Sequence, residues 1–443
     1  MKKNISIKII VSIAYLFLLA GGIIDNTGLQ LIGCSIILGM ILISPADKSI
    51  LYIMAMIPNA AAYTVTAVGV GFLGISFLIL LIKFSVNKCS WSLRTTTSLI
   101  TISLYLLLLS FLRIINGNFY DFAVFIQTLF IVVAWYNILP LLKKRKAIEM
   151  IDFFRFGCIL MTIGMIILYP FKADTAGRFR AVLDDCNYTG GVCCILLGIS
   201  LLTYCYNLPL KHNTFYIFFA ILSGLMTGSR GFLLSVGVLV LILLFTRSFG
   251  KNTKKVITAF FLLLGLFGGL YIVGFGPAVS AYNNTIGRTE TLNEEHTDGQ
   301  FMDVTSGRLV LWAFYLDKAT TDQSILYFGR GFQNYYEEEN GGAGLAAHNM
   351  FISSIIGVGI IGTILIILLY HKTLAHMGLK KVKGRIKVSF YALILSITVN
   401  YFFLDGMLDA RYVSYFAIMV ILIQLYLEQS KRDNPNNIVY RTV

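Results

Sequence analysis

Long uncharged runs of apolar residues alternate with short polar stretches along most of the chain. A helix that crosses the hydrocarbon core of a bilayer needs about 20 predominantly apolar residues. Runs of this kind begin near Ile9, Gly28, Ile50, Val68, Thr96, Phe122, Ile151, Gly190, Thr214, Gly231, Val256, Met350, Val388 and Tyr412. The pattern therefore predicts an all-α, polytopic integral membrane protein with about 14 transmembrane helices.

Composition supports this class. Hydrophobic residues make up 57% of the 443 residues and charged residues 13%, and the mean hydropathy is +0.77, which leaves too little polar surface for a soluble protein of this length. Lys2 and Lys3 before the first apolar run also fit a signal peptide. No small-residue cleavage site follows them, and a second run begins within a few residues, so we interpret the run as the first helix.

The polar interruptions divide the chain into six parts. We expect N-terminal transmembrane helices in 1–170, an extracytoplasmic loop in 171–190, transmembrane helices in 190–275, a large extracytoplasmic loop in 276–347, C-terminal transmembrane helices in 348–428 and a cytoplasmic tail in 429–443. Within the large loop the sequence predicts a helix from Gly307 to Asp317, with Leu309, Trp312, Ala313 and Leu316 along one face. This stretch fits a lid or partner-binding cap, or a solvated loop with one amphipathic turn.

Basic residues in the short loops predict the orientation. With a cytoplasmic N-terminus, the clusters in 143–146, 247–255, 380–387 and 431–432 all lie inside. Ten of the 36 basic residues remain outside: Arg113, Lys172, Arg178, Arg180, Arg230, Arg288, Arg308, Lys318, Arg330 and Arg411. The net charge of +14 thus reflects topology and attraction to anionic membrane lipid, and it needs no nucleic-acid partner.

The exterior basic residues are mostly arginine. Eight of the ten are arginine, whereas the cytoplasmic side has seven arginines and nineteen lysines. A guanidinium group binds phosphate oxygens through paired hydrogen bonds, so this preference indicates anion recognition. Arg230 follows a short Thr-Gly-Ser turn at a helix start, where anions are favoured, although an arginine that extends to the interface gives the same pattern.

A second exterior segment combines basic and acidic residues. Arg178 and Arg180 alternate along an extended stretch and precede Asp184, Asp185 and Asn187. The carboxylates could orient the arginines or bind sugar hydroxyls, and an ordinary polar loop would also have this composition.

Among the five histidines, elimination favours His348 as a catalytic base. His212, His371 and His376 lie on the predicted cytoplasmic side, and His296 lies in an acidic, Asn- and Thr-rich stretch. His348 lies at the exterior start of an apolar run, and an imidazole with a pKa near 6.5 can accept a proton at neutral pH. A lone interfacial histidine is, however, more often structural.

Cysteine usage does not indicate a metal site. Seven cysteines are an odd number without metal-ligand spacing, and only Cys186 lies in a predicted exterior loop, where we expect it to be accessible. We expect no metal and no cofactor.

Five short motifs follow one another in the C-terminal half: Thr227-Gly228-Ser229-Arg230-Gly231, Ser306-Gly307-Arg308-Leu309-Val310-Leu311-Trp312, Gly329-Arg330-Gly331, Ala347-His348-Asn349 and Gly357-Val358-Gly359-Ile360-Ile361-Gly362. In this order they resemble the bacterial O-antigen ligase and polymerase superfamily. The resemblance covers roughly Arg178 to Gly362.

The resemblance implies a membrane glycosyltransferase of the C type in the bacterial cytoplasmic membrane, with its site facing the periplasm or cell exterior. Such enzymes transfer a glycan from an undecaprenyl-diphosphate-linked donor to a sugar hydroxyl with inversion. Expected partners are this donor, a glycan acceptor, a chain-length regulator and a repeat-unit flippase.

Residue roles follow from the matching positions. Arg180 and Arg230, supported by Arg178, Arg308 and Arg330, would bind the diphosphate, and His348 would activate the acceptor. Asp185, Asn187 and Asn349 would contact sugars or orient these groups. Relatives often have proline where this chain has Cys186, which affects the backbone shape expected of the loop.

Three functions remain open at this point. A polymerase would join lipid-linked repeat units into O-antigen, capsule or exopolysaccharide, and a ligase would move a finished glycan onto lipid A core or another acceptor. A transporter would carry ionisable residues near the middle of the membrane. Here the charges gather at one membrane face, which favours an enzyme.

Overall fold

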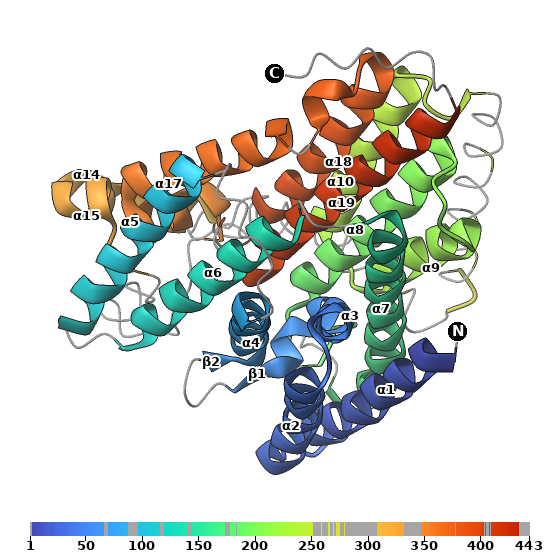
Figure 1. The fold of residues 1–443 in the computed structure, drawn as a ribbon, viewed down its shortest axis with the longest axis horizontal. Helices are drawn as coiled ribbons and strands as arrows, with labels where there is room; N and C mark the ends of the chain where they lie inside the picture. Colours follow the sequence, from blue (N-terminus) through green and yellow to red (C-terminus); the bar gives the residue numbers. More distant parts are fainter. Residues whose placement is uncertain are drawn as a thin grey trace.

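Helices occupy most of the chain in the computed structural model (Figure 1). The structure describes residues 2–65, 70–86, 96–115, 119–139, 143–172, 178–182, 184–250, 308–331, 348–376, 378–402, 404, 407 and 409–433, with a few single residues between 258 and 279.

The first half of the chain forms seven α-helices, a 3-10 turn and a small hairpin within the described residues. They are α1 (Lys2–Ile23), α2 (Thr27–Ile43), α3 (Ala46–Met56), η1 (Ile57–Tyr63), β1 (Thr64–Val65), β2 (Val70–Gly71), α4 (Phe72–Val86), α5 (Thr96–Ile115), α6 (Phe119–Ile138) and α7 (Lys144–Lys172).

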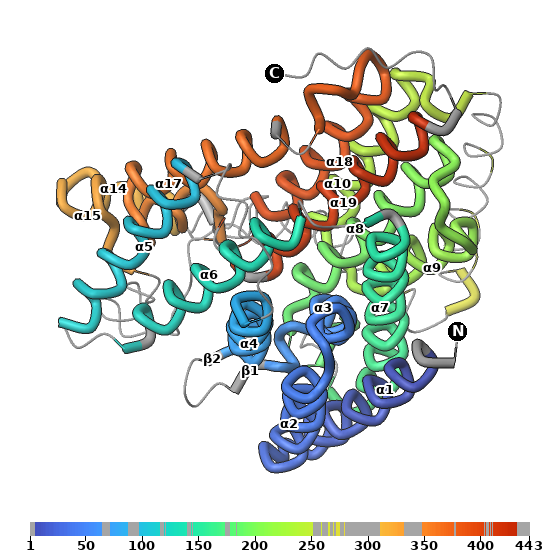
Figure 2. Tube along the Cα trace, in the orientation of Figure 1, coloured from blue at the N-terminus to red at the C-terminus, as the bar shows by residue number. Residues whose placement is uncertain are grey.

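The described part of the second half is entirely helical. Its elements are α8 (Cys186–Tyr206), α9 (Asn213–Met226), α10 (Arg230–Phe245), α14 (Arg308–Thr321), α15 (Gln323–Phe328), α17 (Met350–His376), η7 (Leu379–Lys381), α18 (Gly384–Phe402) and α19 (Ala410–Asp433). Figure 2 shows α14 and α15 beside α5 and α17, at one end of the molecule.

The all-helical, multi-pass membrane architecture agrees with the sequence prediction. Seven of the described helices are long and apolar enough to cross a membrane, namely α1, α5, α6, α7, α8, α17 and α19. Four shorter apolar helices, α2, α4, α9 and α10, and the 19-residue α18 coincide with further predicted spans. The run near Val256 lies outside the described residues, so the number fourteen stays a prediction.

The predicted spans that begin near Ile50 and Val68 differ most from simple crossings. α3 ends after 11 residues and passes into η1 at Pro58, which has no backbone N–H for a helix ladder. Asn59 departs from helical geometry there, and its Nδ2 donates to the carbonyl of Gly157 at 3.1 Å. A two-stranded antiparallel hairpin then pairs Thr64 with Gly71.

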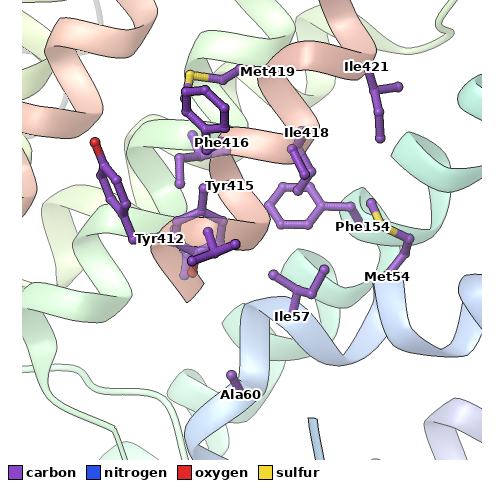
Figure 3. Close-up of a cluster of buried hydrophobic side chains, with 14 of the residues drawn as sticks. Met54, Ile57, Ala60, Phe154, Tyr412, Tyr415, Phe416, Ile418, Met419 and Ile421 are labelled. Carbon is purple, nitrogen blue, oxygen red and sulfur yellow. The ribbon is translucent and has the colours of Figure 1, made fainter. Parts of the chain in front are cut away.

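Two helices are enclosed by the others. Every residue from Thr189 to Thr203 of α8 and from Tyr412 to Ile423 of α19 is buried, as expected for helices that are apolar on all sides. Figure 3 shows Tyr415 and Ile418 of α19 facing Phe154 of α7 and Ile57 of η1. Both helices therefore lie at the centre of the bundle. The residues at the starts of α8 and α19 are positioned by the helices packed around them.

The predicted boundaries need two comments. α19 continues to Asp433, past the expected start of the tail at 429, and residues 434–443 lie outside the described part. Most of the 276–347 loop also lies outside it, except for α14, α15 and the residues that follow to Gly331.

The predicted accessibility of Cys186 is wrong. Cys186 is the first residue of α8 and is 1% exposed, because the helix starts within the bundle. We therefore test the orientation with introduced cysteines. In intact cells or spheroplasts, Gln323→Cys, on the exposed start of α15, should react with a membrane-impermeant thiol reagent, whereas Arg145→Cys should react only after permeabilisation; the native side chain of Arg145 is 92% exposed. The reverse labelling pattern would overturn the orientation.

Candidate functional site

The segment with Arg178 and Arg180 lies extended against α7 and the end of α9. The Phe179 ring stacks on Tyr169 at 3.9 Å between centroids, and the Phe179 N–H donates to the carbonyl of Met226 at 3.3 Å. Arg180 Nε donates to the carbonyl of Lys172 at 3.2 Å, and both arginines are half-buried. These contacts bring the segment beside the turn that precedes Arg230.

The start of α8 is tied to the start of α10. Asp185 caps α8, since its side chain accepts the Asn187 N–H at 2.6 Å. Asn187 Oδ1 in turn accepts a hydrogen bond from the Ser229 hydroxyl at 3.2 Å. Asp185 and Asn187, two of the three residues predicted to contact sugars or orient the site, thus fix two helix ends, and a sugar contact stays a prediction.

Arg230 occupies the position that the sequence predicts. Gly228 has a left-handed backbone (φ 59°), which reverses the chain after α9, and Ser229 caps α10 by accepting the Phe232 N–H at 3.3 Å. Arg230 is the first residue of α10 and is half-buried. The unpaired amides and dipole of such a helix start favour an anion, and the guanidinium adds a full positive charge.

Arg411 is the arginine whose role the sequence analysis missed. Its Nη1 donates to Asp184 at 2.9 Å, its Nη2 donates to Asp409 at 3.0 Å, and its guanidinium lies 3.6 Å from the centroid of the Tyr188 ring. Burial raises the pKa of the Asp184 carboxyl and the Arg411 charge opposes this shift. Because its nitrogens already donate to two carboxylates, Arg411 connects two segments of the protein and is not a candidate phosphate ligand. In the sequence, Asp409 two residues before Arg411 was the one sign that this arginine is paired with an acid.

His348 and Asn349 form the start of α17. Asn349 is the helix cap, because its Oδ1 accepts the N–H groups of Phe351 at 3.0 Å and Ile352 at 3.1 Å. His348 is half-buried with a left-handed backbone (φ 46°), a conformation that costs a residue with a Cβ about 1–2 kcal/mol. The cap role of Asn349 explains its burial.

α17 is broken at Gly359 (φ 73°, ψ 173°), and neighbouring segments bond the carbonyls near the break. The Arg330 N–H donates to Ile356 O at 2.6 Å, the Gly331 N–H to Gly357 O at 3.2 Å, and the Tyr105 hydroxyl to Val358 O at 2.7 Å. Because of these bonds, Arg330 is held along the first half of α17.

Of the two remaining predicted arginines, Arg330 and Arg308, the structure describes the side chain of Arg330 alone. The Arg330 side chain is exposed, and the α5 residue Arg113 donates from Nη2 to Gly329 O at 2.7 Å beside it. Arg308 is the first residue of α14, and its side chain lies outside the described part.

The described residues between Asn400 and Arg411, here called the connector, contact both groups of candidates. Asn400 lies against α8 and α10, because a Cβ on Gly191 would be 2.7 Å from its Oδ1 and a Cβ on Gly231 3.3 Å from its Nδ2. Farther along, the Phe402 ring packs against the Phe351 ring of α17, with 6.2 Å between the ring centroids. The structure thereby brings the Arg230 helix and the His348 helix onto one connector.

The predicted helix in the large loop is confirmed as α14, but its predicted apolar face is wrong. Ala313 and Leu316 are exposed, whereas Leu311, Tyr315 and Ala319 are buried. Tyr315 and Ala319 pack with Ile325 of α15 and with Ile352 and Ile356 of α17. This packing, which the hydrophobic spacing does not reveal, decides the face.

Among the residues that the structure describes, no group of three or more His, Cys, Asp or Glu side chains could hold a metal ion.

Comparison with known proteins identifies one region. Residues 215–367 match the O-antigen ligase family. The matched segment runs from α9 into α17 and contains Arg230, Arg308, Arg330, His348 and Asn349. No curated protein and no solved structure matches the chain.

The break in α17 gives a test of its geometry. Gly359→Ala should lower the melting temperature and impair function, because a Cβ would lie 2.1 Å from the Tyr327 carbonyl and the φ of 73° is unfavourable for alanine. The matched control is Gly237→Ala in α10, where a Cβ meets nothing within 4 Å and alanine should add about 0.5–1 kcal/mol of helix stability. Equal thermal unfolding of the two variants would contradict the described break.

Proposed function

Because residues 215–367 form an O-antigen ligase family domain, we propose that this protein polymerises undecaprenyl-diphosphate-linked oligosaccharide repeat units on the extracytoplasmic face of the membrane. Enzymes of this family transfer lipid-linked glycans. The products would be O-antigen, capsule or exopolysaccharide, and the reaction would be a metal-independent glycosyl transfer with inversion.

One observation carries the proposal. The Phe179–Met226 hydrogen bond holds the segment with Arg178 and Arg180 beside the turn that starts α10 at Arg230. Two segments that carry three candidate arginines therefore lie next to one helix start. A diphosphate needs this kind of site, because its charge is bound best by guanidinium groups and backbone amides together.

The reaction requires little besides this binding. In the proposed step the acceptor hydroxyl oxygen attacks the anomeric carbon of the donor glycan, and the bond between that carbon and the diphosphate oxygen breaks. The electron pair leaves with the diphosphate, whose charge the arginines stabilise, and the hydroxyl proton passes to the His348 imidazole. Attack from the side opposite the leaving group inverts the anomeric configuration.

Ligation is the second candidate, and the match to the O-antigen ligase family favours it. A ligase would use the same arginines and the same histidine and would differ only in the acceptor, lipid A core or another molecule. The two reactions are distinguished by their products, since a polymerase lengthens the lipid-linked glycan whereas a ligase removes it from the lipid. A repeat-unit flippase would supply either enzyme, and a chain-length regulator is expected beside a polymerase.

The first test of this function concerns the fork shape of the arginine side chain. Arg180→Lys and Arg230→Lys should each reduce glycan transfer about tenfold to hundredfold although they keep the charge, because one ammonium cannot make the paired contacts of a guanidinium. Arg145→Lys is the control, since this arginine is 92% exposed and pairs with Glu149 four residues away on the same helix. Transfer is measured with purified protein and lipid-linked donor, and wild-type rates from both site variants would rule out diphosphate binding by these arginines.

The second test concerns the base. His348→Asn should slow transfer by about 10² to 10⁴ while donor binding stays nearly intact, because the arginines bind the diphosphate. Asparagine tolerates the left-handed backbone, so the change removes the imidazole without new strain. His212→Asn is the matched control, since His212 also has a left-handed backbone (φ 58°) but lies before α9 on the predicted cytoplasmic side. Normal turnover by His348→Asn would exclude the base, and loss of donor binding would make His348 a binding residue.

A further inference from the structure

Arg411 makes a buried ionic contact between distant parts of the chain. Its partner Asp184 lies 227 positions earlier, and the two side chains are only 15% and 5% exposed. The guanidinium uses separate nitrogens for Asp184 and Asp409 while its face covers the Tyr188 ring of α8. The contact thus joins the segment before α8, the first turn of α8 and the start of α19.

The Asp184 side of this contact leads directly to the arginine segment. The Asp184 N–H donates to the carbonyl of Ala181 at 3.1 Å, and the Ala181 N–H donates to the Thr189 hydroxyl at 3.2 Å. Ala181 directly follows Arg180. The position of Asp184 therefore restrains the backbone at Arg180 through the Asp184–Ala181 hydrogen bond. The contacts of Phe179 and Arg180 described above lie before this point.

The Asp409 side leads to α17. Asp409 belongs to the connector, in which the Met407 N–H donates to the Ser354 hydroxyl at 3.2 Å and the Met407 carbonyl accepts from the Tyr370 hydroxyl at 2.7 Å. Ser354 lies in the first half of α17, which His348 precedes. Arg411 therefore stands between the segment with the candidate diphosphate ligands and the helix with the candidate base.

We propose that Arg411 is a positioning residue that fixes the Arg178–Arg180 segment, through Asp184, at the distance from the His348 helix that glycan transfer requires. This inference rests on the proposed function. Arginine suits the role because a planar fork contacts two carboxylates and covers an aromatic ring at the same time. A lysine would keep the charge but not all three contacts.

A merely stabilising ion pair would behave differently when both partners are removed. Loss of one partner leaves an uncompensated buried charge and strongly destabilises a protein, whereas loss of both is often neutral for stability. Stability and positioning can therefore be separated. Arg411→Gln alone leaves Asp184 and Asp409 close together without their arginine, whereas the double variant Asp184→Asn/Arg411→Gln leaves only Asp409, whose side chain is 21% exposed. The double variant should therefore regain much of the melting temperature that Arg411→Gln loses, but it should not regain the position of the segment.

The experiment uses the purified full-length protein and a lipid-linked repeat unit as donor. We expect the double variant to raise the KM for the donor at least tenfold with a smaller change in kcat, and Arg411→Lys to show an intermediate rise. The Arg145–Glu149 pair on the predicted cytoplasmic side supplies the control, since Arg145→Gln/Glu149→Gln also removes an arginine and an acid but should leave the KM unchanged. Recovery of both melting temperature and KM in the double variant would overturn the proposal.

Limited digestion with trypsin gives a readout that does not depend on activity. Cleavage after Arg178 and Arg180, followed by mass spectrometry, should be at least tenfold faster in the double variant than in the wild type, because Asp184 no longer holds the segment. Unchanged cleavage would overturn the proposal, and so would faster cleavage with an unchanged KM. If the wild-type protein shows no saturable use of the donor, the proposed function fails, whereas the digestion still reports whether Arg411 holds the segment.

Discussion

The structure depends on the requirement that peptide groups inside a bilayer find partners within the protein. An unbroken helix meets this requirement by itself, and each place where a helix stops needs a donor or acceptor from elsewhere. Lys83 meets it at the end of α2, where its ammonium donates to the carbonyls of Ile41 and Ser44. Asn59 and the α17 break are further examples. Interruptions of the helices are therefore one kind of place where polar side chains enter the bundle.

The candidate site is built at such interruptions. Arg230 follows the reversal at Gly228, and Arg330 lies on the backbone pairing that completes the broken α17. Donors for the break come from α5 as well as from the large loop, because Tyr105 bonds the carbonyl of Val358 and Arg113 that of Gly329. Residues 215–367 match a known family, yet part of the support for their geometry comes from helices before and after the matched segment.

The sequence predicted features that depend on local pattern. The helical class, the position of Arg230 after a capping serine and the helix α14 all follow from periodicity, turn residues and charge, which act within a few positions. The sequence did not predict features that depend on tertiary packing. The exposed side of α14 is set by α17, and the burial of Cys186 results from the start of α8 lying within the bundle. No spacing rule connects Asp184 with Arg411, so an arginine that looked like one more exterior charge is in fact held by two acids.

The separation of Asp184 and Arg411 in the sequence also has a consequence for folding during synthesis. A chain is synthesised from its N-terminus at about 5–20 residues per second, so the 227 residues between the two partners take roughly 10 to 45 s to make. During this interval α8 can already be inserted, while the segment before it lacks its ionic anchor. The region around Arg180 is thus completed only when α19 enters the membrane, and a nascent chain that stops short of α19 has its candidate ligands without their final arrangement.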